Sequence, residues 1–236
     1  MSGHSHFATI KHKKEQSDAK RGTAFSKLAR LISVAAKDGP DPDRNQKLKR
    51  ALEEAKKVNL PKDNIERAIK KGTGELGEER LEEFMFEGYG PGGIAVLIEG
   101  VTDNKNRSLG EVKQILDRNN GKLVGEGAVR WLFERKGVIV ISSKNKEELE
   151  LLAIEAGADD IYWHDSGLDV YTSVDDLEAV KKNLEGKGVK IEGASLDWVA
   201  KEYVSVNPKD KEAAGKLFEL LDENDAVQDV YSNLAD

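Results

Sequence analysis

The spacing of apolar residues changes near residue 80, and this change divides the chain into two regions that need different folds. Between residues 23 and 72, apolar residues recur every three or four positions, which is typical of amphipathic helices. From residue 81 they fall into short alternating runs separated by glycine-rich turns, which is typical of strands. Because no single bundle or sheet accommodates both patterns, we expect an α+β protein with more than one domain.

Three helices are predicted in the N-terminal region, at residues 23–37, at 48–55 and from Pro61 to Gly72. Each has one apolar stripe, so the three must pack together to bury these stripes. We expect Gly72 to cap the third helix. The linker that follows, "GTGELGE", has the G-x-G-x-x-G spacing of a dinucleotide-binding turn. A helix precedes it where that motif needs a strand, so we reject a nucleotide site.

The rest of the chain predicts two α+β units. Residues 82–102 read as two strands joined by the Tyr89–Gly93 turn, and a helix and a strand follow at 106–120 and 128–135. Next comes the β-α-β-β-α-β order of ferredoxin-like domains, at 138–142, 146–156, 159–163, 168–172, 174–185 and 189–199. A last helix and strand, at 209–223 and 226–231, have no domain of their own.

This C-terminal helix and strand can complete the first α+β unit, which lacks a second helix to cover its sheet. We therefore expect a three-helix domain with a basic arm at 1–76 and a discontinuous α+β domain at 77–135 plus 203–236. The third domain, at 136–202, is then ferredoxin-like and inserted into the second.

Charge is distributed unevenly along the chain, whose formal net charge is -7. Residues 1–74 contain 18 Lys and Arg against 9 Asp and Glu, whereas the remaining residues contain 19 against 35. A net charge of +9 beside one of -16 predicts a polyanion-binding region attached to an acidic body. Solvated surfaces without a partner are the alternative.

No set of catalytic residues can be assembled from the sequence. The chain has no cysteine, so a thiolate zinc site and a cysteine nucleophile are excluded. His164 is the only histidine outside the first 12 residues, and nothing selects one carboxylate pair among 44 acidic residues. We expect neither an enzyme nor a cofactor; an uncharacterised hydrolase remains a minor alternative. No apolar run is long enough to span a membrane, so we expect a cytoplasmic protein without a membrane partner.

The first residues, "GHSHFATIKHKKEQSDAKRG" (3–22), form a cationic arm with too little apolar surface to fold alone. Its histidines lack the fixed spacing of a zinc site, so we expect no metal. Short basic arms of this kind bind nucleic acid. The predicted nucleic-acid-binding residues, which include two from the first helix, are His4, His6, Phe7, Lys11, His12, Lys13, Lys14, Lys20, Arg21, Lys27 and Arg30.

A second contact surface is predicted from two later motifs. Glycines in "EGYGPGG" allow a ligand to approach the backbone closely, although a tight hairpin explains them equally well. "TDNKNR" caps a helix through Thr102, Asp103 or Asn104 and places cations beside the helix N-terminus, where phosphate binds well. The predicted surface comprises Tyr89, Gly90, Gly92, Gly93, Lys105, Asn106 and Arg107.

Several long segments resemble the YebC family, which includes the mitochondrial translational activator of cytochrome c oxidase subunit I. They are "GHSHFATIKHKK", "DAKRG", "NLPKDNIERAIKKG", "EGYGPGG", "TDNKNR" and "LFERKG". The resemblance implies the three domains described above and a non-enzymatic nucleic-acid binder. Many members carry the label of transcriptional regulator, while others act in translation at the ribosome. Phe7 stands where the family usually has tryptophan, and His6 where lysine is frequent.

The acidic body disfavours uniform polyanions, since it would be repelled from them. Structured RNA or a ribonucleoprotein, whose basic proteins can face the acidic domains, is the favoured partner. We therefore expect a monomeric, ribosome-associated translation factor. The alternative is a DNA-binding transcriptional regulator, although no recognition helix with base-reading residues at its start stands out.

Overall fold

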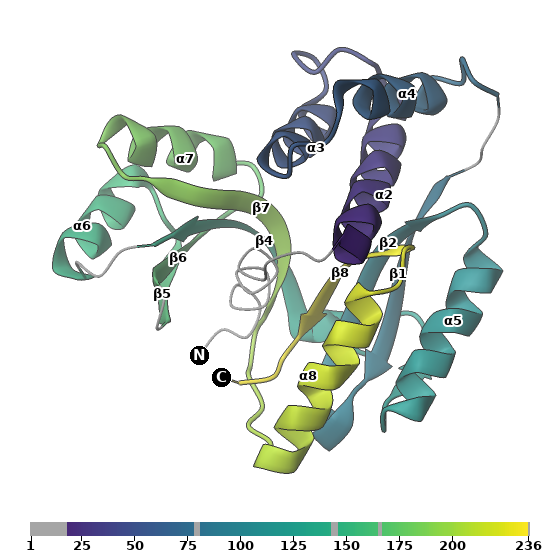
Figure 1. Cartoon of the computed structure of the whole chain (residues 1–236). Helices are drawn as coiled ribbons and strands as arrows, with labels where there is room; N and C mark the ends of the chain where they lie inside the picture. The colour runs from purple at the N-terminus through teal and green to yellow at the C-terminus, as the bar shows by residue number, and fades with distance from the viewer. Residues whose placement is uncertain (1–17, 78–80, 143–145, 165–166, 236) are drawn as a thin grey trace.

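The structure, a computed structural model, describes residues 18–77, 81–142, 146–164 and 167–235. In these ranges it is a mixed α+β protein with seven α-helices and two four-stranded sheets (Figure 1). The mixed fold class is therefore confirmed. None of the helices described is both long and apolar enough to cross a membrane.

Three helices form the helical region, which comprises residues 18–77. They are α2 (Asp18–Ala35), continued by the 3-10 turn η1 (Ala36–Asp38), α3 (Gln46–Lys57) and α4 (Lys62–Gly72). Asn45 begins α3, because its side chain accepts a hydrogen bond from the Leu48 backbone N–H at 3.0 Å. The apolar stripes predicted from the sequence meet in one core built around Ile32, Leu48, Ala51, Ala55 and Ala68.

Gly72 has a different role from the predicted cap. It is the last residue of α4, and the left-handed backbone that ends this helix belongs to Gly74, with φ +83°. A Cβ atom at Gly72 would lie 2.2 Å from the carbonyl oxygen of Ser33 on α2. The missing side chain therefore lets α4 pack directly on α2.

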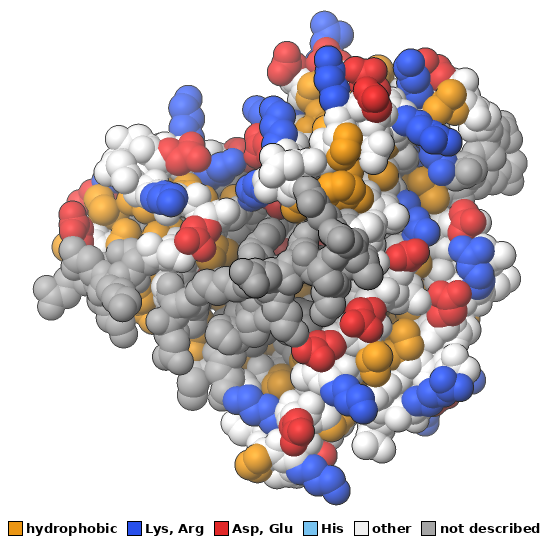
Figure 2. All heavy atoms as spheres, viewed as in Figure 1, with side chains coloured by type: hydrophobic (Ala, Val, Ile, Leu, Met, Phe, Trp, Pro, Cys, Tyr) orange, Lys and Arg blue, Asp and Glu red, His pale blue; other side chains and the backbone are white. Residues whose placement is uncertain are grey.

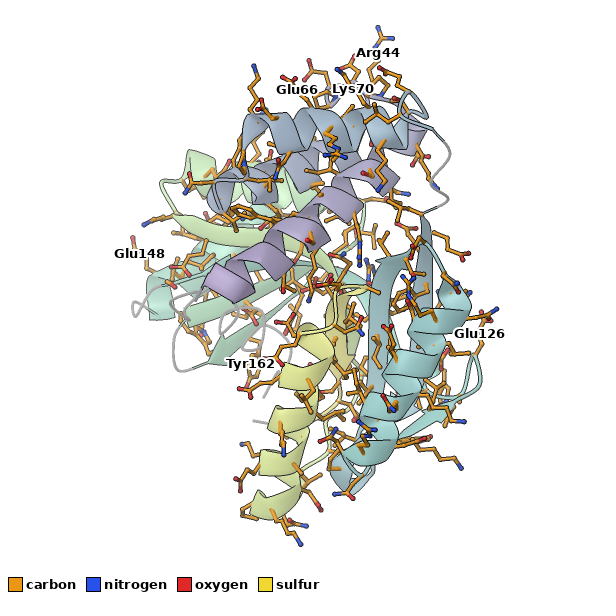
Figure 3. The ribbon with its side chains drawn as sticks, turned by 45° about the vertical axis from the view of Figure 1, so that its right-hand side comes forward. Arg44, Glu66, Lys70, Glu126, Glu148 and Tyr162 are labelled. Carbon is orange, nitrogen blue, oxygen red and sulfur yellow. The ribbon has the colours of Figure 1, made fainter. Side chains whose placement is uncertain are left out.

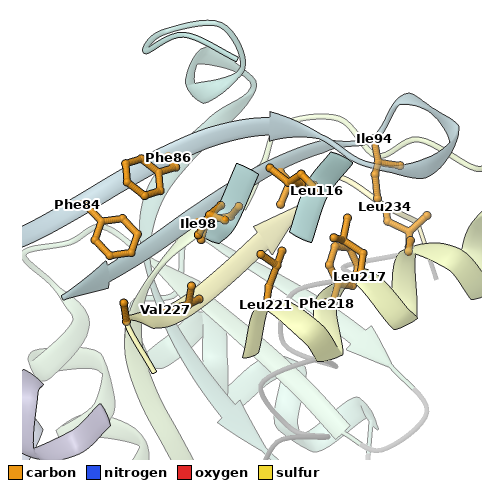
Figure 4. Close-up of a cluster of buried hydrophobic side chains, with 14 residues drawn as sticks. Phe84, Phe86, Ile94, Ile98, Leu116, Leu217, Phe218, Leu221, Val227 and Leu234 are labelled. Atoms are coloured by element: carbon orange, nitrogen blue, oxygen red, sulfur yellow. The ribbon is translucent and has the colours of Figure 1, made fainter. Parts of the chain in front are cut away.

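The first sheet has the strand order β3-β1-β2-β8, and each neighbouring pair is antiparallel. Helices α5 and α8 cover one face, where Phe84, Ile98, Leu116, Leu217 and Leu221 form the centre of the core (Figure 4). The other face carries a second apolar cluster that includes side chains of the second sheet. The elements of this sheet are β1 (Glu82–Tyr89), η2 (Pro91–Gly93), β2 (Ala95–Thr102), α5 (Lys105–Arg118), β3 (Lys122–Val124), α8 (Pro208–Asp222) and β8 (Val227–Ser232).

The second sheet has the strand order β5-β6-β4-β7, again with antiparallel neighbours. Helices α6 and α7 pack on one face, over a core that includes Ile139, Leu168, Val170, Leu177 and Leu184. The elements are η3 (Arg130–Leu132), β4 (Phe133–Ile141), α6 (Lys146–Ala156), β5 (Asp160–His164), β6 (Gly167–Thr172), α7 (Leu177–Gly186) and β7 (Ile191–Ala200). In the chain, β8 follows this sheet but pairs with β2 of the first sheet.

Strand β4 differs from the prediction. The sequence predicts separate strands at 128–135 and 138–142, whereas the structure has a short 3-10 turn followed by one strand from Phe133 to Ile141. Gly137 interrupts the apolar pattern without interrupting the strand. Its missing Cβ makes room for the Thr172 hydroxyl, which would lie 2.2 Å from that atom. The predicted domain boundary between residues 135 and 136 thus lies inside β4.

Candidate nucleic-acid interface

Most of the predicted arm residues lie outside the described part of the chain. These are His4, His6, Phe7, Lys11, His12, Lys13 and Lys14. Lys20 and Arg21 belong to the first turns of α2, but their side chains are not described. The contribution of the arm therefore stays a prediction.

Lys27 and Arg30 attach α2 to the first α+β unit. The Lys27 ammonium is buried and donates to the backbone carbonyl and, at 3.0 Å, to the side chain of Asp222 at the C-terminal end of α8. A cation at this position is stabilised by the helix dipole. Arg30 donates to the carbonyl oxygen of Asp225. The predicted role of Lys27 in binding nucleic acid is not available in this arrangement, because its ammonium is already engaged.

A second set of ion pairs connects the helical region to the second sheet's helices. Arg50 of α3 lies 3.1 Å from Glu178 of α7, and Lys181 of α7 lies 3.6 Å from Glu53 of α3. In the first pair the cation belongs to α3, and in the second it belongs to α7. Cations of the helical region thus contact both α+β units.

Four cations of the helical region remain exposed and make neither an ion pair nor a side-chain hydrogen bond within the described residues: Lys49, Lys56, Arg67 and Lys70. Lys49 and Lys56 are seven residues apart on α3, and Arg67 and Lys70 are three apart on α4, so each pair shares a helix face. Figure 2 shows blue side chains gathered over α3 and α4, and Figure 3 shows Lys70 on the outer surface. These residues were not predicted from the sequence, although their helical spacing opposite the apolar stripes was visible.

The two halves of the second predicted surface lie at opposite ends of the β1–β2 hairpin. Tyr89 pairs with Ala95 at the turn, whereas Glu82 pairs with Thr102, just before Lys105. Seven residue steps of about 3.3 Å separate these ends by about 23 Å. The structure therefore does not bring the two motifs together.

Each half also has local structural roles. Asn104 caps α5 by accepting the Arg107 N–H at 3.0 Å, as one of the three predicted alternatives. The Arg107 guanidinium pairs with Asp103 and lies 3.8 Å from Glu111, so its charge is balanced. Lys105 and Asn106 are exposed.

The glycine turn is shaped by its own backbone and by the chain that leads into α8. Gly92 and Gly93 have φ of +72° and +78°, which side-chain-bearing residues rarely adopt. A Cβ at Gly92 would lie 2.6 Å from Val206, and one at Gly90 would lie 3.0 Å from Ile94. The hairpin interpretation is sufficient for these glycines, while Tyr89 is partly exposed beside them.

A network of side chains joins the two sheets. Glu99 of β2 accepts hydrogen bonds from Trp198 Nε1 at 2.8 Å, Arg135 at 3.1 Å and the Tyr231 hydroxyl at 3.3 Å. Arg130 and Arg135 both place their guanidinium groups near the Trp198 ring, at 4.8 and 5.4 Å from its centroid. These contacts fix the relative position of β2 and β8 against β4 and β7.

Asp197 of β7 lies near this network and has an unusual pKa. Burial and, next, the charge of Asp229 raise the pKa of its carboxyl from 3.8 to about 7. A perturbed carboxyl can indicate a catalytic site. However, within the described residues no group of three or more His, Cys, Asp and Glu could hold a metal ion, and the His164 side chain is not described.

Glu87 of β1 holds the loop before η3. It is buried, and its carboxylate accepts backbone hydrogen bonds from Gly127 at 2.6 Å, Val129 at 2.7 Å and Arg130 at 2.9 Å. Burial alone would raise its pKa, but the three N–H groups and the Arg130 charge together lower it. This role was not predictable from the sequence, because only the fold brings Glu87 to the loop.

Comparisons with known proteins cover nearly the whole chain. Residues 5–75 match the family model for the TACO1/YebC protein N-terminal domain, and residues 81–234 match that for the TACO1/YebC second and third domain. A probable transcriptional regulatory protein of Caldanaerobacter subterraneus subsp. tengcongensis is 48% identical, over 99% of this chain and 98% of its own length. One of Thermoanaerobacter pseudethanolicus is 47% identical, over 99% and 97%. The crystal structure of a conserved hypothetical protein from Aquifex aeolicus matches with a TM-score of 0.88 and 45% identity, covering 98% of this chain and 96% of that one.

Proposed function

The chain belongs to the TACO1/YebC family, and from this premise we propose that it is a non-enzymatic, nucleic-acid-binding regulator of gene expression. We propose further that it acts in translation, by binding structured RNA at the ribosome. The names of its relatives support a regulatory role. The proposed role in translation depends on how charge is arranged on the molecule.

The observation that carries this proposal is the set of four exposed cations on α3 and α4. Lys27, Arg30 and Arg50 are held by acidic partners or carbonyl groups. Lys49, Lys56, Arg67 and Lys70, in contrast, are available to phosphate. Residues 75–236 carry a large excess of acid. Nucleic acid is therefore attracted to one end of the molecule and repelled from the rest.

This asymmetry favours a partner with both charges. The ribosome presents phosphates together with basic proteins, so it can contact the cationic end and the acidic units at the same time. A bare duplex offers only phosphate, and the acidic units would weaken its binding. We therefore favour RNA in a ribonucleoprotein over duplex DNA as the binding partner.

A DNA-binding transcriptional regulator is the second candidate. The observation in its favour is that the relatives are named probable transcriptional regulatory proteins. The same four cations would then contact duplex phosphates. The two candidates differ in which nucleic acid the intact chain binds more tightly.

For the architecture we propose the three domains expected from the sequence, with 136–202 as a ferredoxin-like insertion between 77–135 and 203–236. The strand order β5-β6-β4-β7 and the return of β8 to the first sheet support it. The continuous β4 and β7 ladder supports a close attachment of the insertion, because these strands run from one unit into the other.

The test uses the full chain with Lys49, Lys56, Arg67 and Lys70 changed to alanine. The matched control changes four exposed lysines of the acidic units, which also make no ion pair within the described residues: Lys182, Lys190, Lys209 and Lys211. Each phosphate contact that a substitution removes should lower the slope of log affinity against log salt by about 0.7 to 0.9. We expect the first variant to show this decrease in ribosome co-sedimentation, and the control to show none.

The same preparation distinguishes the two candidates at one fixed salt concentration. Ribosome binding by the intact chain, tighter than its binding to duplex DNA, supports the translational assignment. Sequence-selective binding to duplex DNA without ribosome co-sedimentation would establish the transcriptional one instead. Equal behaviour of the two four-residue variants would show that the helical region is not the interface.

A further inference from the structure

Trp131 is the most exposed aromatic side chain described, with 65% of its surface accessible. Tryptophan is normally among the more buried residue types, because its large apolar ring is unfavourable in water. Neither of the other two tryptophans is comparable: Trp198 is buried at the joint between the sheets, and Trp163 is half-buried. An exposed ring of this size needs an explanation beyond folding.

The ring is held in place, because the turn that carries it is fixed on both sides. The Trp131 indole N–H donates to the Ala128 carbonyl at 3.0 Å, and the Trp131 carbonyl accepts from the Lys201 ammonium at 2.9 Å. The Lys201 backbone N–H donates in turn to the Leu132 carbonyl at 2.9 Å. The single turn of η3 is therefore attached to the end of β7.

The loop that precedes η3 is fixed by a side chain of β1. Glu87 accepts the backbone N–H groups of Gly127, Val129 and Arg130, so three residues of the loop share one buried carboxylate. Arg130 places its guanidinium over Trp198 rather than over Trp131. The exposed Trp131 ring is thus carried on a fixed turn and held by its own indole N–H, so a ligand that stacks on it pays a low entropic cost.

We propose that Trp131 is a stacking platform for an unpaired base of RNA. This inference rests on the proposed function and identifies a second contact point outside the helical region. Base–aromatic stacking is the usual way in which proteins hold single-stranded or looped nucleotides, and it tolerates any base because each has a π-face.

The charges around the ring support a base rather than a phosphate. The exposed charged side chains next to it in sequence and at the end of β7 are Glu126, Arg130, Glu134, Lys201 and Glu202. Lys136 lies 3.5 Å from Glu134 and brings the local charge to balance. Figure 3 shows Glu126 on the outer surface of the molecule. A surface with balanced charge has no general attraction for phosphate. Binding at this place therefore depends on stacking of a base on the Trp131 ring.

The same surroundings disfavour a protein partner. Hot spots of protein interfaces consist of an aromatic anchor within a cluster that becomes desolvated on binding. The exposed neighbours named above are charged, and the loop contributes Gly125 and Gly127, so no apolar cluster among the described residues of this loop surrounds the indole. A flat base needs only the ring itself.

The experiment measures binding of the full chain to two RNA probes: a hairpin with a loop of unpaired adenines, and a blunt duplex of the same stem. Trp131→Ala should bind the hairpin about tenfold more weakly, and Trp131→Phe should bind it nearly as well as the wild type. Neither change should affect the duplex. The matched control is Leu151→Ala, since Leu151 is 63% exposed on α6 and equally apolar.

Two further readouts separate stacking from a general decrease of affinity. The decrease caused by Trp131→Ala should be the same at low and high salt, because stacking releases no counterions, unlike the decrease from the α3 and α4 variant. The hairpin should also quench tryptophan emission in the wild type and less so in Trp131→Phe.

The stacking inference would be overturned if Trp131→Ala bound the hairpin as tightly as the wild type and the hairpin did not quench tryptophan emission in the wild type. The surface around Trp131 would then be left to a protein partner. If the α3 and α4 variant still lowers the salt slope in that case, the proposed function stands alone. Failure of the wild-type chain to bind any RNA or ribosome would instead overturn the proposed function, and the stacking platform with it.

Discussion

Glu87→Gln is the substitution whose effect follows most directly from the structure. One carboxylate oxygen of Glu87 accepts the Gly127 N–H, and the other accepts those of Val129 and Arg130. Glutamine keeps the volume but has one oxygen and one NH2 group. Whichever way the amide is turned, at least one backbone N–H then faces another donor, and the remaining bonds lose the assistance of the negative charge.

The expected cost follows from these three bonds. A hydrogen bond to a charged group contributes about 1.5 to 3 kcal/mol, and an unsatisfied buried donor costs about 1 to 3 kcal/mol. Removing one bond and weakening two should lower the local stability of the loop by about 2 to 4 kcal/mol. Because 1.4 kcal/mol corresponds to a factor of about ten, the amides of residues 127–130 should exchange with solvent at least about 30-fold faster.

The pH dependence of the same amides gives an independent check. The folded-state pKa of Glu87 is below its ordinary value of 4.5, so the folded protein binds fewer protons than the unfolded chain in that range. The stabilisation is therefore complete above pH 4.5 and is lost as the pH falls through the lowered pKa. Wild-type protection should decrease on acidification, whereas protection in Glu87→Gln should not change over that interval.

Hydrogen exchange resolved by residue is the assay, with Glu83→Gln as the control. Glu83 lies on the same strand and its side chain is exposed, so its substitution leaves the loop contacts intact and the exchange pattern should match the wild type. Equal protection of residues 127–130 in wild type and Glu87→Gln would refute the argument. It would mean that η3 and the end of β7 hold the loop without the carboxylate.

Three further substitutions test other parts of the structure. Gly72→Ala places a methyl group against the backbone of α2. It should lower the free energy of unfolding of the helical region, measured in urea, by about 1 to 3 kcal/mol. Gly110→Ala, where the added methyl group meets open space on α5, should raise the free energy of unfolding slightly. Arg50→Glu should loosen the α3–α7 contact in small-angle scattering, and adding Glu178→Arg should restore it; an exposed pair contributes about 0.2 to 1 kcal/mol. Burial and the neighbouring Asp229 carboxylate raise the pKa of Asp197 from 3.8 to about 7. The free energy of unfolding of the wild type therefore falls as the pH rises through that interval. Asp197→Asn should raise the free energy of unfolding at about pH 8 and flatten its dependence on pH.

The elements were predictable where local pattern decides them. The stripes that contain Ile32 and Leu48 specify helices, and the alternation on either side of the Tyr89–Gly93 turn specifies a hairpin. Both strands of that hairpin were predicted, and their antiparallel pairing alone places Lys105 at the end opposite Tyr89. This pairing therefore excludes a single surface formed by the Tyr89–Gly93 turn together with residues 105–107.

Contacts between distant segments were not predictable in the same way. Gly137 reads as a gap between two strands and Gly72 as a helix cap, yet each is small because another element packs against it. Lys27 reads as one more exposed lysine on a cationic helix, and only the position of α8, almost 200 residues later, shows that it is buried. Trp131 lies within the strand predicted at 128–135, whereas the structure places it in a 3-10 turn with an exposed side chain.

The net charge of the N-terminal region overstates the number of its contacts with phosphate. Lys27, Arg30 and Arg50 are engaged with the acidic units, so they release no counterions when nucleic acid binds. The four exposed cations of α3 and α4 that make no ion pair within the described residues, each contributing about 0.7 to 0.9, limit the salt slope of these helices to about 3 to 4. A measured slope above this limit would require further phosphate contacts, for which the arm offers Lys11, Lys13, Lys14, Lys20 and Arg21. The size of the slope therefore assigns phosphate contacts to the arm or to the helices before any residue of the arm is changed.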